Sequence, residues 1–200
     1  MADFKTSNTA KNLMRAFAGE SQARNRYTMA AGLARFQKMP MVEAIFLYTA
    51  AQEKEHAEIF YKFLGPFDGE TIVVDGGYPV DLELNMLAQL KAAAHNEYEE
   101  HDRVYKEFGD TAEKEGFHEI AAAFRMIGEI EKTHGKRFAY LAEYLEKGEL
   151  YRGSRKKSWI CTNCGFIFEG DKAPEMCPVC GHEQGYFARE ELAPWHLREE

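Results

Sequence analysis

Four cysteines near the C-terminus constrain this chain more than any other feature. They form two C-x-x-C pairs, Cys161/Cys164 and Cys177/Cys180, and a glycine follows each pair. Four thiolates at this spacing can surround one tetrahedral metal ion, and the glycines permit sharp turns with positive φ. Because the sequence holds no other cysteine, a reduced, cytoplasmic thiolate site is a better interpretation than a disulfide framework.

Length and charge narrow the class of protein. Two hundred residues suffice for one sizeable domain and one small one. The formal net charge of −8 argues against nucleic-acid binding, which normally requires a basic face. The start of the chain does not resemble a secretory signal, and the longest apolar run, 41–51, is too short to cross a bilayer. We therefore expect a cytoplasmic protein with no nucleic-acid or membrane partner.

Apolar residues recur every three or four positions before the cysteine pairs, and this period predicts α-helices. The predicted helices cover residues 9–38, 41–63, 81–115 and 117–147. Thr9 and Asp81 are suitable N-caps, and Pro40, Gly116 and Gly148 lie where helices should stop. The long connection between the second and third helices indicates one crossover joining two antiparallel hairpins of a four-helix bundle. Within this connection, residues 71–74 alternate like a strand.

The composition changes after the fourth helix. We expect a bundle domain over 1–147, a polar, basic linker over 148–157 and a small acidic domain over 158–200. A domain of this length needs a metal to fold stably, and its aromatic side chains can supply a core. These side chains are Trp159, Phe166, Phe168, Tyr186, Phe187 and Trp195.

Acidic residues interrupt the apolar stripe of each predicted helix. The second and fourth helices each carry a Glu-x-x-His motif, whose two side chains share one helix face. The first and third helices each add a glutamate, and this combination is the ligand set of a dinuclear metal centre inside a bundle. The set comprises Glu20, Glu53, His56, Glu97, Glu131 and His134.

The spacing of this set indicates an internal duplication. Glu20 and Glu53 are 33 residues apart, and their counterparts in the second half are 34 residues apart. The two hairpins would then meet around a pseudo-two-fold site. One position breaks the symmetry, because Glu100 has Ala23 as its counterpart. The second half therefore offers one additional carboxylate.

Other interpretations of these residues stay open from the sequence. A single Glu-x-x-His motif on a helix can arise by chance, although two in register with two further glutamates are much harder to obtain that way. His101 lies four residues after Glu97 and could compete as a ligand, but its repeat counterpart is Arg24. Tyr27 and Tyr105 could face the metal site or serve as core aromatic residues.

With these motifs in place, the chain resembles the rubrerythrin family. Residues 16–27 are similar to its first-helix signature, and Glu-x-x-Glu at 97–100 followed by Tyr105 completes its diiron pattern. The cysteine pairs resemble a rubredoxin domain in its usual C-terminal place. The implied fold class is mainly α, with a ferritin-like four-helix bundle and a small rubredoxin-like domain. The connection 64–79 departs from the family pattern.

The resemblance implies a non-haem diiron peroxidase that reduces hydrogen peroxide to water and protects against oxidative stress. Electrons would enter through a mononuclear Fe(Cys)4 site. Two carboxylates would bridge the irons, three residues would be terminal ligands, and two would exchange on one iron with oxidation state. The bridging carboxylates would be Glu53 and Glu131. The terminal ligands would be Glu20, Glu97 and His134. The two exchanging ligands would be Glu100 and His56.

Three alternatives to an iron-dependent peroxidase stay open from the sequence. A ferritin-like ferroxidase that handles iron would use the same bundle but leave the redox domain without a purpose. An electron-transfer or oxygen-sensing protein would leave the glutamates underused. Zinc accepts the same four sulfurs as iron and would make the small domain structural. The expected partners are hydrogen peroxide, an upstream reductase or rubredoxin, and a second copy in a homodimer whose small domain lies near its partner's diiron centre.

Overall fold

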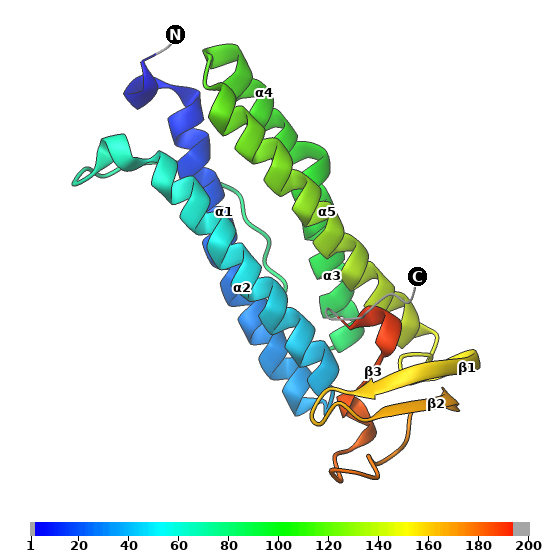
Figure 1. Ribbon diagram of the computed structural model, residues 1–200. Helices are drawn as coiled ribbons and strands as arrows, with labels where there is room; N and C mark the ends of the chain where they lie inside the picture. The colour runs from blue at the N-terminus through cyan, green and yellow to red at the C-terminus, as the bar shows by residue number, and fades with distance from the viewer. Residues whose placement is uncertain (1–2, 194–200) are drawn as a thin grey trace.

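The computed structural model describes residues 3–193 and contains a long helical bundle with a small β domain at one end (Figure 1). The bundle is built from α1 (Asn8–Phe36), α2 (Pro40–Phe63), α3 (Met86–Glu99), α4 (Tyr105–Glu115) and α5 (His118–Glu146). A π-helical turn, Glu100–Val104, joins α3 to α4, so that these two helices form one rod. Two antiparallel hairpins result, α1/α2 and α3–α4/α5, and the predicted four-helix bundle is confirmed.

The predicted start of the third helix was wrong. Asn85, not Asp81, is the N-cap of α3, and its side chain accepts a hydrogen bond from the backbone N–H of Ala88 at 3.2 Å. The carboxylate of Asp81 is instead held by Arg26 at 3.3 Å and by the side-chain amide of Asn96 at 2.8 Å. Tertiary partners therefore keep Asp81 in the connection.

The connection between the hairpins contains a 3-10 turn at Gly65–Phe67 and is otherwise irregular up to α3. Residues 71–74 form no strand, because no second strand lies beside them to share a hydrogen-bonded ladder. Figure 1 shows the connection running along the bundle between α1 and the second hairpin.

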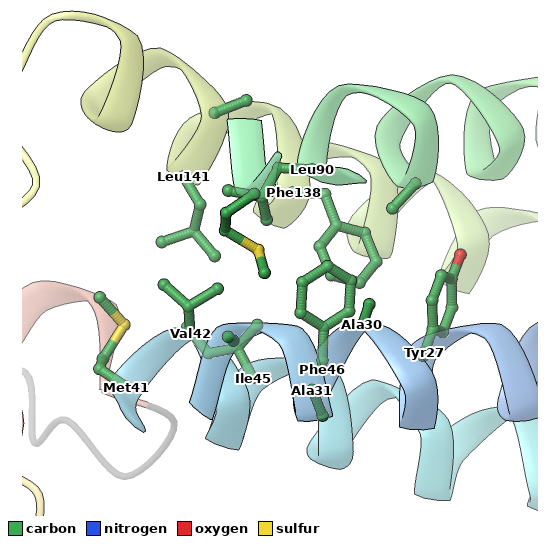
Figure 2. Packing of buried hydrophobic residues seen from close by; sticks show 14 of the residues in the cluster. Tyr27, Ala30, Ala31, Met41, Val42, Ile45, Phe46, Leu90, Phe138 and Leu141 are labelled. Carbon is green, nitrogen blue, oxygen red and sulfur yellow. The ribbon is translucent and has the colours of Figure 1, made fainter. Parts of the chain in front are cut away.

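Two buried clusters fill the bundle at different heights along its axis. One contains Tyr27, Phe46 and Phe138, with the rings of Phe46 and Phe138 stacked at 4.9 Å (Figure 2). The other contains Phe60 and Phe124, whose centroids are 5.0 Å apart. Burial of each large apolar side chain contributes about 1.5–3 kcal/mol. These two clusters hold the four rods in register above and below the acidic residues.

The small domain contains a three-stranded antiparallel sheet in the order β2-β1-β3. Its strands are β1 (Arg152–Cys161), β2 (Ile167–Lys172) and β3 (Phe187–Arg189). Trp159 and Phe187 are fully buried in one cluster with Cys161 and Cys177, as predicted for this core. Phe168 is not part of this core, because it lies on the solvent side of β2 and is exposed. Trp195 lies outside the described residues.

The segment expected to be a linker, 148–157, is partly structured. β1 begins at Arg152, although its pairing with β2 shifts register between Arg152 and Lys157. The sheet also packs on the end of the bundle. The Arg189 guanidinium lies 3.9 Å from the centre of the Tyr144 ring and donates to the carbonyl oxygen of Glu149 at 3.0 Å. Among residues 3–193, no helix is long and apolar enough to cross a membrane.

Candidate metal centres

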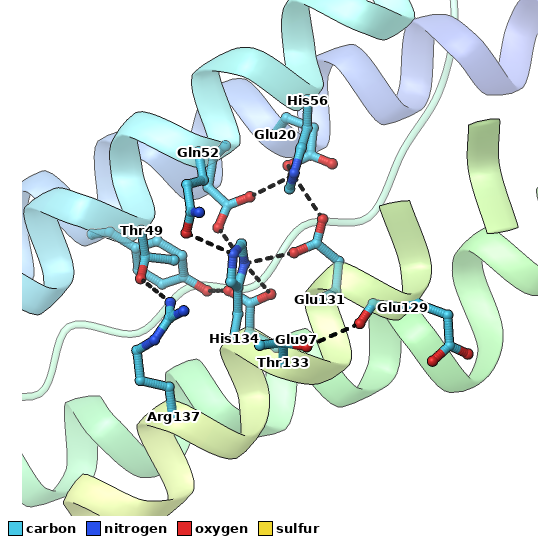
Figure 3. A network of polar contacts seen from close by, with 12 residues as sticks. Glu20, Thr49, Gln52, His56, Glu97, Glu129, Glu131, Thr133, His134 and Arg137 are labelled. Carbon is cyan, nitrogen blue, oxygen red and sulfur yellow. Dashed lines mark hydrogen bonds and ion pairs between the residues drawn. The ribbon is translucent and has the colours of Figure 1, made fainter. Parts of the chain in front are cut away.

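The predicted bundle ligands meet at mid-height between the four rods. Glu20 comes from α1, the first Glu-x-x-His pair from α2, Glu97 from α3 and the second pair from α5 (Figure 3). Each side chain projects inward because its position falls on the buried stripe of its helix. All six are at most 4% exposed: Glu20, Glu53, His56, Glu97, Glu131 and His134.

Each histidine of this set faces three carboxylate oxygens through one nitrogen. The Nδ1 atom of His134 lies 2.7 Å from Glu131, 3.1 Å from Glu53 and 3.5 Å from Glu97. One nitrogen carries at most one proton and cannot donate to three oxygens. Such a ring of donor atoms is the arrangement of ligands that converge on a shared cation.

The second cluster repeats this geometry. The Nδ1 atom of His56 lies 2.8 Å from Glu131, 3.1 Å from Glu53 and 3.8 Å from Glu20. In both clusters the donor atoms lie within 4.8 Å of one another. Glu53 and Glu131 each direct one oxygen to His56 and the other to His134. Two carboxylates are thus shared by two adjacent cation positions.

The cluster is short of positive charge. Buried polar atoms normally have a hydrogen-bond partner, yet several ligand atoms here have none. They are Glu20 Oε2, Glu53 Oε1, Glu97 Oε2, both Glu131 oxygens and His134 Nδ1. Unpartnered carboxylate oxygens and imidazole nitrogen that point at one another fit a pair of metal ions.

The electrostatics of the site support the same conclusion. Burial, followed by repulsion from Glu131, raises the pKa of Glu20 well above its usual range. Burial and then Glu53 do the same to the pKa of Glu97. Burial alone would raise the pKa of Glu53, but contacts with both histidines outweigh it and lower that pKa to about 2. The cluster therefore holds protons where cations would otherwise sit.

The seventh candidate, Glu100, lies beside these clusters rather than within either of them. It opens the π turn, is half-buried, and has a pKa raised by burial and then by the charge of Glu20. A π turn accommodates one extra residue in a helix and is frequent at functional sites. His101, on the same turn, faces the surface, where it contacts Asp102 at 2.6 Å and Glu129 at 3.1 Å. The structure does not place His101 with the ligands.

The two tyrosines whose role the sequence left open both face the site. The Tyr27 hydroxyl donates to Glu97, and the Tyr105 hydroxyl donates to Glu20. Each fixes one carboxylate that is not shared between the clusters. Sequence reasoning missed Gln52, whose Oε1 atom lies 3.0 Å from Nε2 of His134. The available signal was a polar residue on the inner face of α2, next to Glu53.

The four cysteines form a second site, in the small domain. The Sγ atoms of Cys161 and Cys180 are 3.7 Å apart, as are those of Cys164 and Cys177. A disulfide would bring two sulfurs to about 2.05 Å. Four thiolates at about 2.3 Å from one tetrahedral ion lie roughly 3.8 Å from one another. The spacing therefore fits a mononuclear metal site.

The turns around the cysteines have the conformation that the sequence predicted. Gly165 has a φ of 80° and Gly181 a φ of 71°, in the left-handed region that favours glycine. The backbone N–H of His182 lowers the pKa of Cys180 to about 6, which favours the thiolate that a metal requires.

Comparison with known proteins identifies the family to which both sites belong. The Rubrerythrin family matches residues 11–142, and the rubrerythrin rubredoxin-like domain matches residues 159–188. The chain belongs to the rubrerythrin family. Rubrerythrin of Clostridium perfringens is 47% identical over 188 residues, which cover 94% of this chain and 96% of that protein. Rubrerythrin of Nitratidesulfovibrio vulgaris is 38% identical over 187 residues, with 94% and 96% covered.

Solved structures confirm the ferritin-like fold of this chain. Nigerythrin in a partially reduced state matches with a TM-score of 0.62 and 27% identity, over 94% of this chain and 90% of that chain. The bacterioferritin of Desulfovibrio desulfuricans, at 20% identity, matches with a TM-score of 0.64 over 71% of this chain and 82% of that chain. The family and the two clusters together confirm the expected cofactors, a diiron centre and one Fe(Cys)4 site.

Proposed function

We propose that this protein is a peroxidase that reduces hydrogen peroxide to two molecules of water. The reaction consumes two electrons and two protons. One observation supports it above all: a single chain carries two cation positions that share two carboxylates, together with a separate four-thiolate site. When loaded, the diferrous pair would supply both electrons for O–O cleavage, and the thiolate-bound iron would replace them singly.

The protein's own residues divide the work of holding this centre. We assign Glu53 and Glu131 as bridging ligands because each directs one oxygen to the His56 cluster and the other to the His134 cluster. Glu20 and Glu97 are assigned as terminal ligands, since each is held by a tyrosine hydroxyl on its other oxygen. His134 is assigned as a further terminal ligand, beside Glu97 at the second position. The four cysteines, Cys161, Cys164, Cys177 and Cys180, would hold the third iron.

Glu100 and His56 are assigned as alternative ligands of one iron. Glu100 lies beside the clusters without joining them. Among the described residues, no hydrogen bond fixes Nε2 of His56, whereas Gln52 fixes that of His134. A ferrous ion accepts neutral imidazole readily, and a ferric ion prefers an additional carboxylate. The less restrained histidine and the nearby spare carboxylate therefore support an exchange that follows oxidation state.

The arrangement of the two domains favours electron transfer between subunits. Glu20 is 16 residues from the end of α1 at Phe36, which is about 24 Å along the helix. The small domain packs beyond that end, where Lys38 pairs with Glu183 at 3.3 Å. We therefore propose a cytoplasmic homodimer in which one subunit's small domain approaches its partner's diiron centre, fed by an upstream reductase or rubredoxin.

Stopped-flow oxidation of the fully reduced protein tests the proposed reaction. We expect hydrogen peroxide to oxidise the iron far faster than dioxygen does, and both the diiron and Fe(Cys)4 sites to lose electrons. Steady peroxide consumption should follow when a reductant is supplied. A mineral core that grows on addition of ferrous ion, without peroxide turnover, would instead support an iron-handling ferroxidase.

A further inference from the structure

The irregular connection between the hairpins covers a small cavity next to the diiron site. The cavity has a volume of about 190 Å³. On its inner side lie Gly19, Glu100 and Tyr105. Gly19 precedes the ligand Glu20, Glu100 is itself a proposed ligand, and Tyr105 donates a hydrogen bond to Glu20. On its outer side lie Gly77 and Tyr78 of the connection. It therefore leads from the surface toward the proposed metal position that Glu20 and Glu100 serve.

Tyr78 is wedged against the wall of this cavity. A β-carbon added at Gly19 would lie 3.6 Å from its ring, which is ordinary van der Waals contact. A β-carbon at Gly76 would lie 2.7 Å from its hydroxyl oxygen, so any larger residue at position 76 would push the end of the ring out of this place. The hydroxyl donates to the carbonyl oxygen of Arg15 at 2.9 Å. The ring is thus fixed between α1 and its own loop.

A polar clasp fastens the same segment to α1. The Arg15 guanidinium donates to the backbone oxygen of Asp75 at 2.9 Å and to its carboxylate at 2.7 Å. Its remaining nitrogen donates to Asn12 at 2.7 Å. Together with the hydroxyl of Tyr78, these bonds hold the connection against one short stretch of α1. This explains how an irregular segment keeps a defined position over the cavity.

We propose that the cavity is the entry for peroxide and that Tyr78, held by the Arg15–Asp75 clasp, is a gate that admits hydrogen peroxide and rejects bulky hydroperoxides. This inference rests on the proposed function. Drug-sized ligands occupy pockets of about 300–1,000 Å³, and a cavity of 190 Å³ is smaller. At its rim Arg103 is paired with Glu99 at 3.1 Å, so their charges largely cancel and do not select the substrate.

The first test measures access without turnover. Azide binding to the oxidised protein is followed by its ligand-to-iron absorption band. Tyr78→Ala should accelerate azide association by about tenfold, and Tyr78→Phe, which keeps the ring, should leave it within about twofold of wild type. A β-carbon at Gly77 meets nothing within 4 Å, so Gly77→Phe can add a ring at the rim without a clash and should slow association. Tyr61→Ala, which removes a more exposed tyrosine from α2, away from the cavity, is the control.

The second test measures selectivity. The ratio of kcat/KM for cumene hydroperoxide to that for hydrogen peroxide should rise about tenfold in Tyr78→Ala, and less in Asp75→Ala, which only loosens the clasp. Equal azide rates in wild type, Tyr78→Ala and Gly77→Phe would overturn the gate whether or not the protein is a peroxidase. The expected azide rates without any peroxide turnover would retain the entry and refute the proposed function.

Discussion

The side-chain oxygen of Gln52 lies 3.0 Å from Nε2 of His134, so it accepts a hydrogen bond from the Nε2–H group while Nδ1 faces the carboxylates (Figure 3). A partner of this kind fixes the orientation of a ligand histidine and makes it a better donor. His56, in the equivalent position, has no such partner among the described residues. The two clusters are therefore similar in composition and different in rigidity.

The first prediction concerns this glutamine. Gln52→Ala should weaken metal binding at the His134 position by about 10–100-fold, the usual effect of removing a partner of a metal-binding histidine. Titration of the metal-free protein with Co²⁺, followed by visible absorption, will measure it. Glu55→Ala, at an exposed position on the same helix, is the control. Unchanged affinity at both metal positions would show that Gln52 has no such role.

Much of the site could be predicted from the sequence because its ligands lie on regular elements. Residues three apart on a helix share a face, so the Glu-x-x-His pairs indicate which face of α2 and of α5 turns toward the interior of the bundle. The glycine after each cysteine pair likewise predicted a sharp turn with positive φ. Asn85 and Asp81 are equally good caps in isolation, and only the contacts of Asp81 with Arg26 and Asn96 decide between them.

The connection was beyond sequence reasoning for a related reason. Its position depends on hydrogen bonds between irregular backbone and one arginine of α1, and no periodicity encodes such contacts. The sequence alone therefore gives no signal that distinguishes Tyr78 from other loop residues. Gln52 was missed because a glutamine on a helix carries no distinctive spacing of its own. Both residues act through tertiary contacts that become visible only when the rods are assembled.

The second prediction tests the proposed ligand exchange. Glu100→Ala should leave two irons bound while disfavouring the diferric state, so the reduction potential should rise and oxidation by peroxide should slow. His56→Ala should weaken the diferrous state and lower the potential. A tenfold change in relative affinity corresponds to about 59 mV for one electron. Potentiometric titration will measure both shifts. Wild-type potentials and peroxidase rates in both variants would contradict the exchange, although the diiron site could remain.

The third prediction concerns metal content. Protein purified without oxygen should hold three irons per chain and be red, because thiolate-to-ferric charge transfer absorbs visible light and is bleached by reductant. Cys180→Ser should remove one metal and the colour while retaining the two metals of the bundle. Val179→Ser, at an exposed position within the same cysteine pair, should retain all three metals. Elemental analysis and absorption spectra will decide. Zinc in native protein would leave the small domain without a redox role.

The last prediction concerns pH and the metal-free bundle. Burial and neighbouring carboxylates raise the pKa values of Glu20 and Glu97 in the folded chain. Burial lowers the pKa of His134, but its contacts with Glu131, Glu53 and Glu97 outweigh this and raise it to about 12. Each group thus binds protons more tightly when folded than when unfolded.

The sign of the effect follows from this difference. A raised folded pKa gives stability that is full below the unfolded value and is lost as pH rises toward the folded one. The unfolded values are about 4.3 for glutamate and about 6.5 for histidine. The thermal midpoint of the metal-free bundle, followed by helical circular dichroism, should therefore fall as pH rises from about 5 to about 9. Glu53, with its lowered pKa, opposes this trend only toward acidic pH.

Metal should remove this dependence, because the ions replace the protons that the cluster otherwise holds. Loading should flatten the pH profile and release protons, which calorimetry in buffers of different ionisation enthalpy can count. Glu97→Gln, which removes one such proton site, should show a shallower fall of the metal-free midpoint than wild type. Glu55→Gln, at an exposed position, should follow the wild-type profile. A metal-free midpoint that rises between about pH 5 and 9 would contradict the proton-holding cluster.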